Sequence, residues 1–201
     1  MSDLACAATV LVARHGATDY VETWFSDEGG WLSAEGRSQA RGLADALRDR
    51  RLARVWSSDT SRAVQTAELV AARVGVAAQV PVLTRRSLRE ADAGDLRGQP
   101  FDVHRLHEVT DRWFAGDLDA RFPGGESGRE VVDRYAAELA AVADEHRGET
   151  ALVVGHQTAL SIVVPVLTGR TDRSRAHELA NGEYAELAVD ADGWRLVEDA
   201  Q

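Results

Sequence analysis

The sequence predicts an α/β fold: a three-layer sandwich in which helices cover both faces of a mostly parallel central sheet. Three observations predict it, namely short apolar runs typical of buried strands, amphipathic segments between those runs, and a length of 201 residues that suits one domain. Strands that alternate with helices form βαβ units, and these units place their strands in parallel. We therefore expect a single domain over residues 1–201.

The first half of the chain supplies two predicted strands and two predicted helices. Residues 9–14 (TVLVAR) form a continuous apolar run typical of a strand that is covered on both faces. Ser33 is a suitable N-cap for a helix over about 34–50, which has its apolar residues on one face. A second strand is expected over 54–57 (RVWS), and an amphipathic helix over 61–74 follows it.

The second half continues the alternation and ends in a hairpin. A capping box, Ser-Gly-Arg-Glu, opens a predicted helix over about 127–146. Residues 150–154 (TALVV) form another fully apolar strand, and a helix over about 158–167 follows it. Residues 183–189 and 194–198 flank Asp-Ala-Asp-Gly, which is typical of a hairpin turn. We expect this hairpin to add an antiparallel edge strand to the sheet.

The segment 85–125 does not fit this alternation. It combines many charges with large apolar side chains: Phe101, Leu106, Trp113, Phe114 and Phe122. We expect it to form a small helical cap, inserted over one end of the sheet. Ligands of such sheets bind beyond the carboxyl ends of the strands, so residues that directly follow strands are the first candidates for a site.

The composition excludes several classes of function. The 33 acidic and 23 basic residues give a net charge of −10, which argues against a partner that is nucleic acid or an anionic membrane. All 23 basic residues are arginines, which excludes lysine chemistry such as Schiff bases, pyridoxal phosphate and lysine-containing phosphate loops. The lone Cys6 excludes a disulfide framework, and no apolar stretch approaches the roughly 20 residues of a membrane span. We expect a cytoplasmic protein.

Two predicted strands end in a histidine beside a glycine. His15 follows the first strand and precedes Gly16, and His156 follows Gly155 at the end of the strand 150–154. A single histidine at a strand end is more often structural than catalytic. Two histidines at equivalent positions of different strands favour a shared site, and Gly16 indicates a tight turn or a close approach beside His15.

Two arginines occupy positions that are unfavourable for a cation without a counter-charge. Arg14 ends an apolar strand, where burying a charge is costly unless an anion meets it. Arg62 falls in the first turn of the helix 61–74, where the helix dipole disfavours a cation. Arg62 fits there if it shares an anion with the amide groups of the helix N-terminus. The alternative for Arg62 is an exposed residue without a role.

Six sequence blocks occur in one order along the chain: LVARHGAT, LSAEGRSQA, SSDTSRAVQTAE, LREADAGDLRG, PGGES and VVGH. Together they resemble the histidine phosphatase superfamily, the phosphoglycerate-mutase-like enzymes, over essentially the whole chain. The resemblance implies that His15 is the nucleophile and forms a phosphohistidine. It also implies that Arg14 and Arg62 bind the phosphate, that Glu90 is the proton donor, and that His156 is the second histidine of the pocket, donating a hydrogen bond to the phosphoryl group.

The implied roles agree with the chemistry of these residues. Nearby arginines are expected to lower the pKa of His15 and keep its ring neutral. A backbone carbonyl near Gly16 is expected to hold the other ring nitrogen, and we place Gly16 itself in the phosphate-binding group. Because Arg and His supply the positive charge, we expect no metal and no cofactor. An alternative for Glu90 is a capping box with Ser87.

Five positions depart from the pattern usual in the family: Ala17, Val21, Asp27, Glu28 and Gln157. Val21 stands where many members of the family have an asparagine that contacts the phosphate. The five core residues are intact, so the departures bear on the rim of the pocket, and through it on the identity of the substrate and on catalytic efficiency.

The remaining histidines are interpreted as structural or solvated. His104 and His107 stand three apart on a predicted helix and could form a metal pair, but no third ligand of recognisable spacing accompanies them, so surface positions are favoured. We expect His146 and His177 to be solvated at helix ends or in loops.

The leading functional hypothesis is a metal-independent phosphatase that hydrolyses a small phosphomonoester, with a small phosphorylated metabolite as its partner. One alternative is a phosphoglycerate mutase primed by a bisphosphoglycerate, although the short interval between Glu90 and His156 leaves little room for a mutase cap. Another is a non-catalytic relative that binds a phosphorylated ligand. The C-terminal hairpin could also pair across a homodimer.

Overall fold

The computed structural model describes residues 7–19, 24–26, 29–75, 79–170 and 179–197. Within these ranges the chain forms six strands and five α-helices. The strands are β1 (Ala8–Arg14), β2 (Leu52–Ser58), β3 (Val82–Arg85), β4 (Thr150–Gly155), β5 (Tyr184–Asp190) and β6 (Gly193–Val197). The helices are α1 (Ala34–Ala46), α2 (Ser61–Val74), α3 (Val103–Phe114), α4 (Gly128–Glu145) and α5 (Gln157–Leu167).

The strands form one mixed sheet in the order β3-β2-β4-β1-β5-β6. The first four are parallel, and β5 and β6 add an antiparallel hairpin at the edge. This arrangement confirms the predicted α/β fold and its antiparallel edge. Arg14 pairs with Gly155 at the ends of β1 and β4, so the histidines that follow, His15 and His156, leave the sheet side by side.

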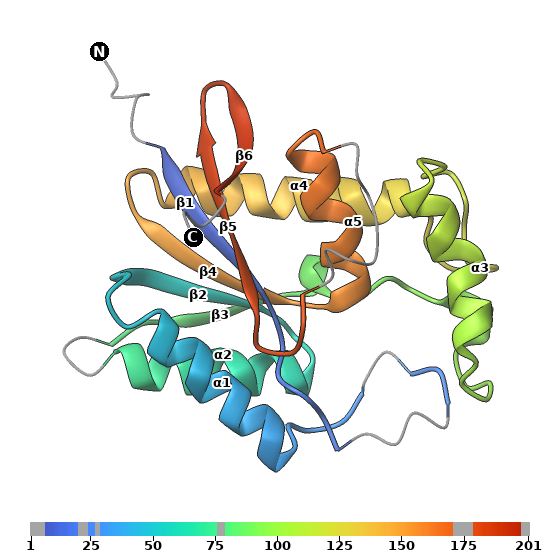
Figure 1. Ribbon diagram of the computed structural model, residues 1–201, viewed down its shortest axis with the longest axis horizontal. Coiled ribbons are helices and arrows are strands. Elements are labelled where there is room, and N and C mark those ends of the chain that lie inside the picture. The colour runs from blue at the N-terminus through green and yellow to red at the C-terminus, as the bar shows by residue number, and fades with distance from the viewer. Residues whose placement is uncertain (1–6, 20–23, 27–28, 76–78, 171–178, 198–201) are drawn as a thin grey trace.

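Helices cover both faces of the sheet, with α1 and α2 on one side and α4 and α5 on the other (Figure 1). The alternation of side chains along β1 explains how both faces are filled. Leu11 and Ala13 pack with the residues of α1 and α2, while Val10 and Val12 pack with those of α4 and α5. Each strand of this kind is apolar on both faces, which is why it is recognisable in the sequence. In the described ranges, no helix has the length and apolar character needed to cross a membrane.

Local signals set some helix ends and tertiary contacts set others. The capping box of α4 is present, because the Ser127 hydroxyl accepts from the Glu130 N–H and the Glu130 carboxylate accepts from the Ser127 N–H. Helix α1 ends at Ala46 instead of near residue 50, because the chain turns there and Arg51 adopts a φ of 49° before β2. The short strand β3 was not predicted, since its four residues contain no apolar run.

The segment between β3 and α4 contains the expected helical cap. It holds two 3-10 turns, Arg86–Leu88 and Gly94–Leu96, and helix α3, which lies at one end of the molecule in Figure 1. Trp113 anchors this segment: its ring meets the Phe122 ring edge-on at 5.4 Å, and its indole N–H donates to the Ala120 carbonyl. The edge strand β6 lies at the end of the sheet, and pairing of this edge across a homodimer stays a prediction.

Two glycines allow the loop after β1 to lie directly against α1. A Cβ atom at Gly36 would be 1.9 Å from the Ala17 carbonyl oxygen, and one at Gly16 would be 2.4 Å from the Gly36 carbonyl oxygen. Real side chains do not approach backbone atoms this closely. The expected close approach beside His15 is therefore present, and its partner is the backbone of α1.

This contact predicts opposite effects for two glycines of the same helix. Gly36→Ala should lower the free energy of unfolding by about 1–3 kcal/mol, because its Cβ would overlap the Ala17 oxygen. Gly42→Ala is the matched control, since a Cβ there meets nothing within 4 Å. It should raise stability by up to about 1 kcal/mol, the ordinary helix preference for alanine. Urea denaturation of both variants measures the difference, and two effects of the same sign would contradict the packing argument.

Candidate active site

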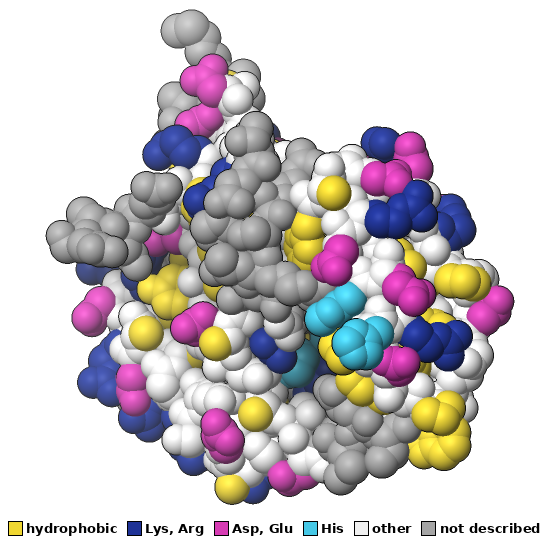
Figure 2. Space-filling view, turned by 45° about the vertical axis from the view of Figure 1, so that its right-hand side comes forward, with side chains coloured by type: hydrophobic (Ala, Val, Ile, Leu, Met, Phe, Trp, Pro, Cys, Tyr) yellow, Lys and Arg dark blue, Asp and Glu magenta, His cyan; other side chains and the backbone are white. Residues whose placement is uncertain are grey.

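A cavity of about 570 Å³ opens at the carboxyl edge of the parallel strands. Arg14, His15, Arg62 and Glu90 all line it, so the structure brings four of the sequence-predicted residues to one place. They come from the end of β1, the first turn of α2 and the segment that precedes the cap. Figure 2 shows histidine side chains gathered around a hollow on this side of the molecule, with hydrophobic side chains beside them.

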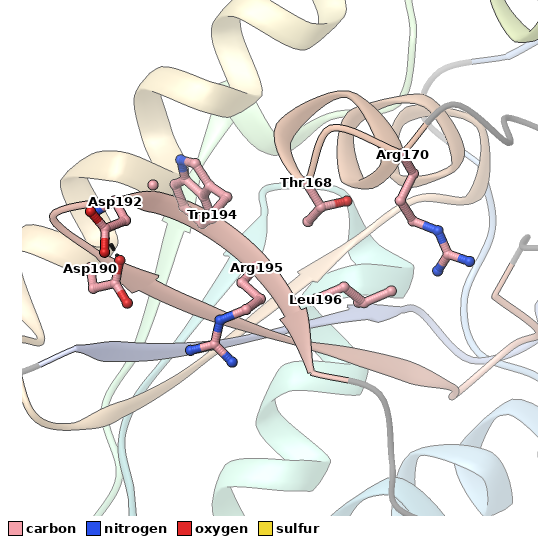
Figure 3. A pocket seen from close by; sticks show the side chains of 8 residues that line it. Thr168, Arg170, Asp190, Asp192, Trp194, Arg195 and Leu196 are labelled. Carbon is pink, nitrogen blue, oxygen red and sulfur yellow. Dashed lines mark hydrogen bonds between the residues drawn. The ribbon is translucent and has the colours of Figure 1, made fainter.

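A second cavity, of about 400 Å³, lies beside the β5–β6 hairpin (Figure 3). The hairpin turn follows the end of β5, where Val189 pairs with Ala8 at the start of β1, so this cavity lies at the opposite end of β1 from His15. Figure 3 shows Asp190 and Asp192 at one end of it and Arg170 at the other. It contains none of the sequence-predicted site residues.

The His15 ring is fixed in one tautomer by its two hydrogen bonds. Its Nδ1 lies 2.8 Å from the Gly16 carbonyl oxygen, which can only accept, so Nδ1 carries the proton. Its Nε2 lies 3.1 Å from Nε of Arg62, a guanidinium nitrogen that can only donate. The lone pair of His15 is therefore on Nε2, the nitrogen on the Arg62 side. The expected carbonyl partner near Gly16 is confirmed.

His15 is held in its neutral form. Burial of the ring and the charge of Arg62 lower its pKa from 6.5 to about 3, and Arg14 adds a smaller effect in the same direction. The hydrogen bond to Gly16 acts the opposite way. The sequence analysis attributed the lowered pKa of His15 to the arginines alone. Loss of hydration on burial is the larger cause of the lowered pKa.

His156 lies behind the cavity wall and is completely buried. Its Nδ1 accepts from NH2 of Arg62 at 3.2 Å, and its ring meets the His15 ring at a centroid distance of 5.1 Å. Burial and the Arg62 charge hold its pKa well below the ordinary value, so this ring is also neutral. In the described structure His156 therefore contacts Arg62 directly, and its expected contact with a phosphoryl group stays a prediction.

Glu90 is held by the N-terminus of another helix. The backbone N–H groups of Thr158 and Ala159, in the first turn of α5, donate to its carboxylate at 3.0 and 2.8 Å. The alternative capping box with Ser87 is wrong, since the Ser87 hydroxyl donates to Glu138. A helix N-terminus presents free N–H groups and a positive dipole end, so it fixes a carboxylate at this place.

Arg134 of α4 fixes the backbone that carries Glu90. Its guanidinium donates to the carbonyl oxygens of Ser87, Arg89 and Glu90 at 2.7 to 3.0 Å. It also forms an ion pair with Glu126 at 2.7 Å. The sequence analysis missed this residue, because one arginine among 23 basic residues gives no local signal. Arg134 is a positioning residue for the carboxylate.

Other residues of the site also escaped the sequence analysis. Asn181 donates to the His15 carbonyl oxygen at 2.9 Å, which ties the chain before β5 to the end of β1. His107 and Trp24 line the cavity, whereas His107 was expected at the surface. The N–H of Gly16 donates to the Thr66 hydroxyl at 3.0 Å, and its expected contact with phosphate stays a prediction.

Two of the five positions that depart from the family pattern lie among the described residues. Ala17 and Gln157 both line the cavity. Val21, Asp27 and Glu28 lie outside the described residues, as do His177 and Cys6.

The expectation for His146 was wrong. Its side chain is buried, with Nδ1 3.0 Å from Glu149 and Nε2 accepting from the Trp56 indole at 3.3 Å. The end of α4 packs onto β2, which removes this histidine from water. Across the described part of the chain, no group of three or more His, Cys, Asp or Glu side chains is placed to hold a metal ion.

A family model for the histidine phosphatase superfamily (branch 1) matches residues 10–200. The chain belongs to this superfamily. The probable phosphoglycerate mutase GpmB of Salmonella choleraesuis is 32% identical over 203 residues, which cover 95% of this chain and 91% of that protein. The phosphoglycerate mutase-like protein 4 of Arabidopsis thaliana is 34% identical over 159 residues, which cover 74% of this chain and 66% of that protein.

Solved structures of phosphatases and related proteins share the fold. Bacillus stearothermophilus YhfR has a TM-score of 0.79 and 25% identity, with 97% of this chain and 98% of that chain covered. A mycobacterial glucosyl-3-phosphoglycerate phosphatase has a TM-score of 0.74 and 26% identity, with 94% and 97% covered. The relatives of this histidine phosphatase family member thus include both mutase-like proteins and a named phosphatase.

The environment of His15 predicts an unusual titration. With a pKa of about 3, the ring of the free enzyme should stay neutral from pH 8 to pH 5, whereas an ordinary histidine is mostly protonated at pH 5. Nitrogen NMR of the histidine rings should show Nδ1 protonated and Nε2 unprotonated throughout this range.

Arg62→Gln should raise the pKa of His15, since it removes one of the charges that lower it. In the unfolded chain His15 binds a proton below about pH 6.5, whereas in the folded protein its ring stays neutral until about pH 3. His15 therefore lowers the free energy of unfolding progressively as the pH falls below about 6.5. A His15 signal that titrates near pH 6.5 in the folded enzyme would contradict the proposed burial.

Proposed function

We propose that this protein is a metal-independent phosphatase that hydrolyses a small phosphomonoester through a phosphohistidine on His15. One observation carries the proposal: a neutral imidazole, with its lone pair on Nε2, lies in a cavity that also holds two arginines and a carboxyl group. A neutral ring nitrogen is a nucleophile toward phosphorus, and the cations stabilise the charge on the phosphoryl oxygens.

In the first step, the Nε2 lone pair of His15 attacks phosphorus and the bond from phosphorus to the ester oxygen breaks. The leaving oxygen takes a proton from the protonated carboxyl group of Glu90, and an alcohol departs. Arg62 already donates to Nε2 in the free enzyme, so its N–H groups must turn to the phosphoryl oxygens when substrate binds. Arg14, which lines the same cavity, adds a second cation.

In the second step, water attacks the phosphorus of the phosphohistidine. Glu90, now a carboxylate, accepts a proton from that water, and the phosphorus–nitrogen bond breaks to release inorganic phosphate. The electron pair of that bond returns to Nε2, and the proton returns to Glu90, so the enzyme ends in its starting state. Positive charge comes throughout from arginine side chains, so the proposed cycle needs no metal and no cofactor.

The described wall of the cavity favours hydrolysis over mutase chemistry. A mutase must hold a second anionic group while its bisphosphorylated intermediate reorients. The described segments 24–26 and 101–107 contribute mainly apolar side chains to the cavity lining, and His107 is the one side chain they contribute that can become a cation. The names of the mutase-like relatives keep isomerisation as the second candidate.

We propose a small phosphorylated metabolite of the cytoplasm as the substrate. The net charge of −10 disfavours polyanionic partners such as nucleic acid or an anionic membrane, whereas a single phosphate group can be met by two local arginines.

The proposed function is tested by measuring phosphate release and isomer formation in the same reaction. With EDTA present, a panel of phosphomonoesters should release phosphate without a primer, and 3-phosphoglycerate with bisphosphoglycerate should yield little 2-phosphoglycerate. His15→Ala should abolish turnover, and brief exposure to labelled substrate should leave an acid-labile, base-stable label on His15. Primed isomerisation that outpaces phosphate release by orders of magnitude would replace the phosphatase with the mutase.

The role of Glu90 predicts a dependence on the leaving group. Glu90→Gln keeps the size of the side chain but cannot donate the proton, so alkyl phosphates should lose roughly 10²- to 10⁴-fold in kcat/KM. Nitrophenyl phosphate should lose less in the first step, because nitrophenolate leaves without a proton. Arg129→Gln, which breaks an exposed ion pair with Asp119, is the control and should change neither value. Equal losses for both kinds of ester would argue against a general acid.

A further inference from the structure

We infer that the alcohol half of the substrate is apolar, an alkyl or aryl-alkyl group, and that Trp24 and Val103 select it. This inference rests on the proposed function, since it concerns the part of the ester beyond the phosphate. The cavity lining comes from two sets of segments. The charged residues Arg14, Arg62 and Glu90 come from the end of β1, the first turn of α2 and the segment before the cap. The outer wall is the part contributed by the segments 24–26 and 101–107, namely Trp24, Phe25, Ser26, Phe101, Val103, Leu106 and His107.

Two residues of the outer wall expose much of their apolar surface to solvent. Trp24 is 52% exposed and Val103 is 40% exposed. Among the described residues, the large hydrophobic side chains with such exposure are these two, Trp31 and Leu83, so half of them flank this cavity. Exposed apolar surface costs about 25 cal/mol per Å², a cost that a bound apolar group removes. Apolar surface gathered around a concave site is typical of ligand binding.

The wall is held in place before any ligand binds. Trp24 forms a β-bridge with Pro100, and the neighbouring Phe25 N–H donates to the Gln99 carbonyl oxygen at 2.9 Å. The rings of Phe25 and Phe101 then pack at a centroid distance of 5.0 Å. A preformed wall loses little conformational entropy when it binds an apolar group.

The apolar surface continues outward from the cavity. A neighbouring hollow of about 590 Å³ shares Phe101 and Val103 with it and adds Pro100. Its charged residues are Asp102 and Arg105, and Arg105 donates to the Gln99 side chain at 2.6 Å. The described surface therefore offers space for an alcohol longer than two or three carbons.

The polar groups of the described outer wall are too few for a sugar. A sugar phosphate carries several hydroxyl groups, and each must exchange its water for a protein partner. The segments 24–26 and 101–107 contribute Ser26 and His107 as their polar side chains to the cavity lining. The other uncharged polar residues of the lining adjoin His15 or His156 in the chain or by a hydrogen bond: Thr18, Gln157, Thr158 and Asn181. Hydroxyls placed against the rings of the outer wall would lose hydrogen bonds to water, whereas methylene or aromatic groups would gain by leaving it.

The test compares esters whose leaving groups are equally basic, so that only the alcohol differs. Both 2-phenylethyl phosphate and glucose 6-phosphate are primary alkyl phosphates. We expect kcat/KM to be at least about tenfold higher for the phenylethyl ester, mainly through a lower KM. Trp24→Ala should reduce the ratio of the two kcat/KM values about tenfold, and Val103→Asp should reduce it as well. Trp31→Ala is the matched control, because Trp31 is 65% exposed and does not line the cavity, and it should leave the ratio unchanged.

The results distinguish a failure of the inferred preference for apolar alcohols from a failure of the proposed phosphatase activity. A kcat/KM for glucose 6-phosphate that equals or exceeds that of the phenylethyl ester would overturn the inference while leaving the phosphatase intact. A ratio that is the same in the Trp24 and Val103 variants as in the parent would also overturn it. If neither ester nor the wider panel released phosphate and His15 took no label, the proposed function itself would fail, and the inference with it.

Discussion

The site depends on the guanidinium of Arg62, which hydrogen-bonds His15 in the cavity and the buried His156 at once. Its Nε donates to His15 and its NH2 donates to His156, at 3.1 and 3.2 Å. A guanidinium cannot accept, so both ring nitrogens that face it must carry lone pairs. Its charge adds to burial in lowering both histidine pKa values. One cation therefore contacts both rings, adds to the lowering of both pKa values and leaves a lone pair on each ring nitrogen that faces it.

The backbone holds this arrangement from several directions. Thr66 accepts from the N–H of Gly16 and donates to the carbonyl oxygen of Arg62, so one hydroxyl joins the loop after β1 to the first turn of α2. Gly29 lets the chain pass close to Arg62, because a Cβ there would lie 2.2 Å from the guanidinium. His15 and Arg62 are thus kept in one geometry by contacts of Thr66 and Gly29 as well as by their own hydrogen bond.

Glu90, the proposed proton donor, is positioned by a separate set of contacts. Its carboxylate is fixed by the N-terminus of α5, which directly follows His156, and its backbone is fixed by Arg134. The second histidine and the proton donor are therefore both set by the junction between β4 and α5. The apolar outer wall comes from the cap and from the segment around Trp24, so it can vary without disturbing this junction. Because the proposed catalytic residues and the outer wall come from different segments, the same proposed reaction can act on esters of different alcohols.

The sequence by itself determined the layers of the fold, the ends of the parallel strands and the residues His15, His156, Arg14, Arg62 and Glu90. Arg14, His15 and His156 are readable because an apolar strand and the residues at its end are local patterns, and parallel strands bring such residues to one edge. Arg62 is readable from its place in the first turn of a helix, and Glu90 was predicted from the family resemblance. Only the tertiary structure decided the contacts of Arg134, the burial of His146 and the apolar wall at Trp24 and Val103. Each of these depends on segments far apart in the chain that meet only through packing, so no local pattern records them. The larger share of burial in the pKa of His15 has the same origin, since hydration is lost only when the fold closes around the ring.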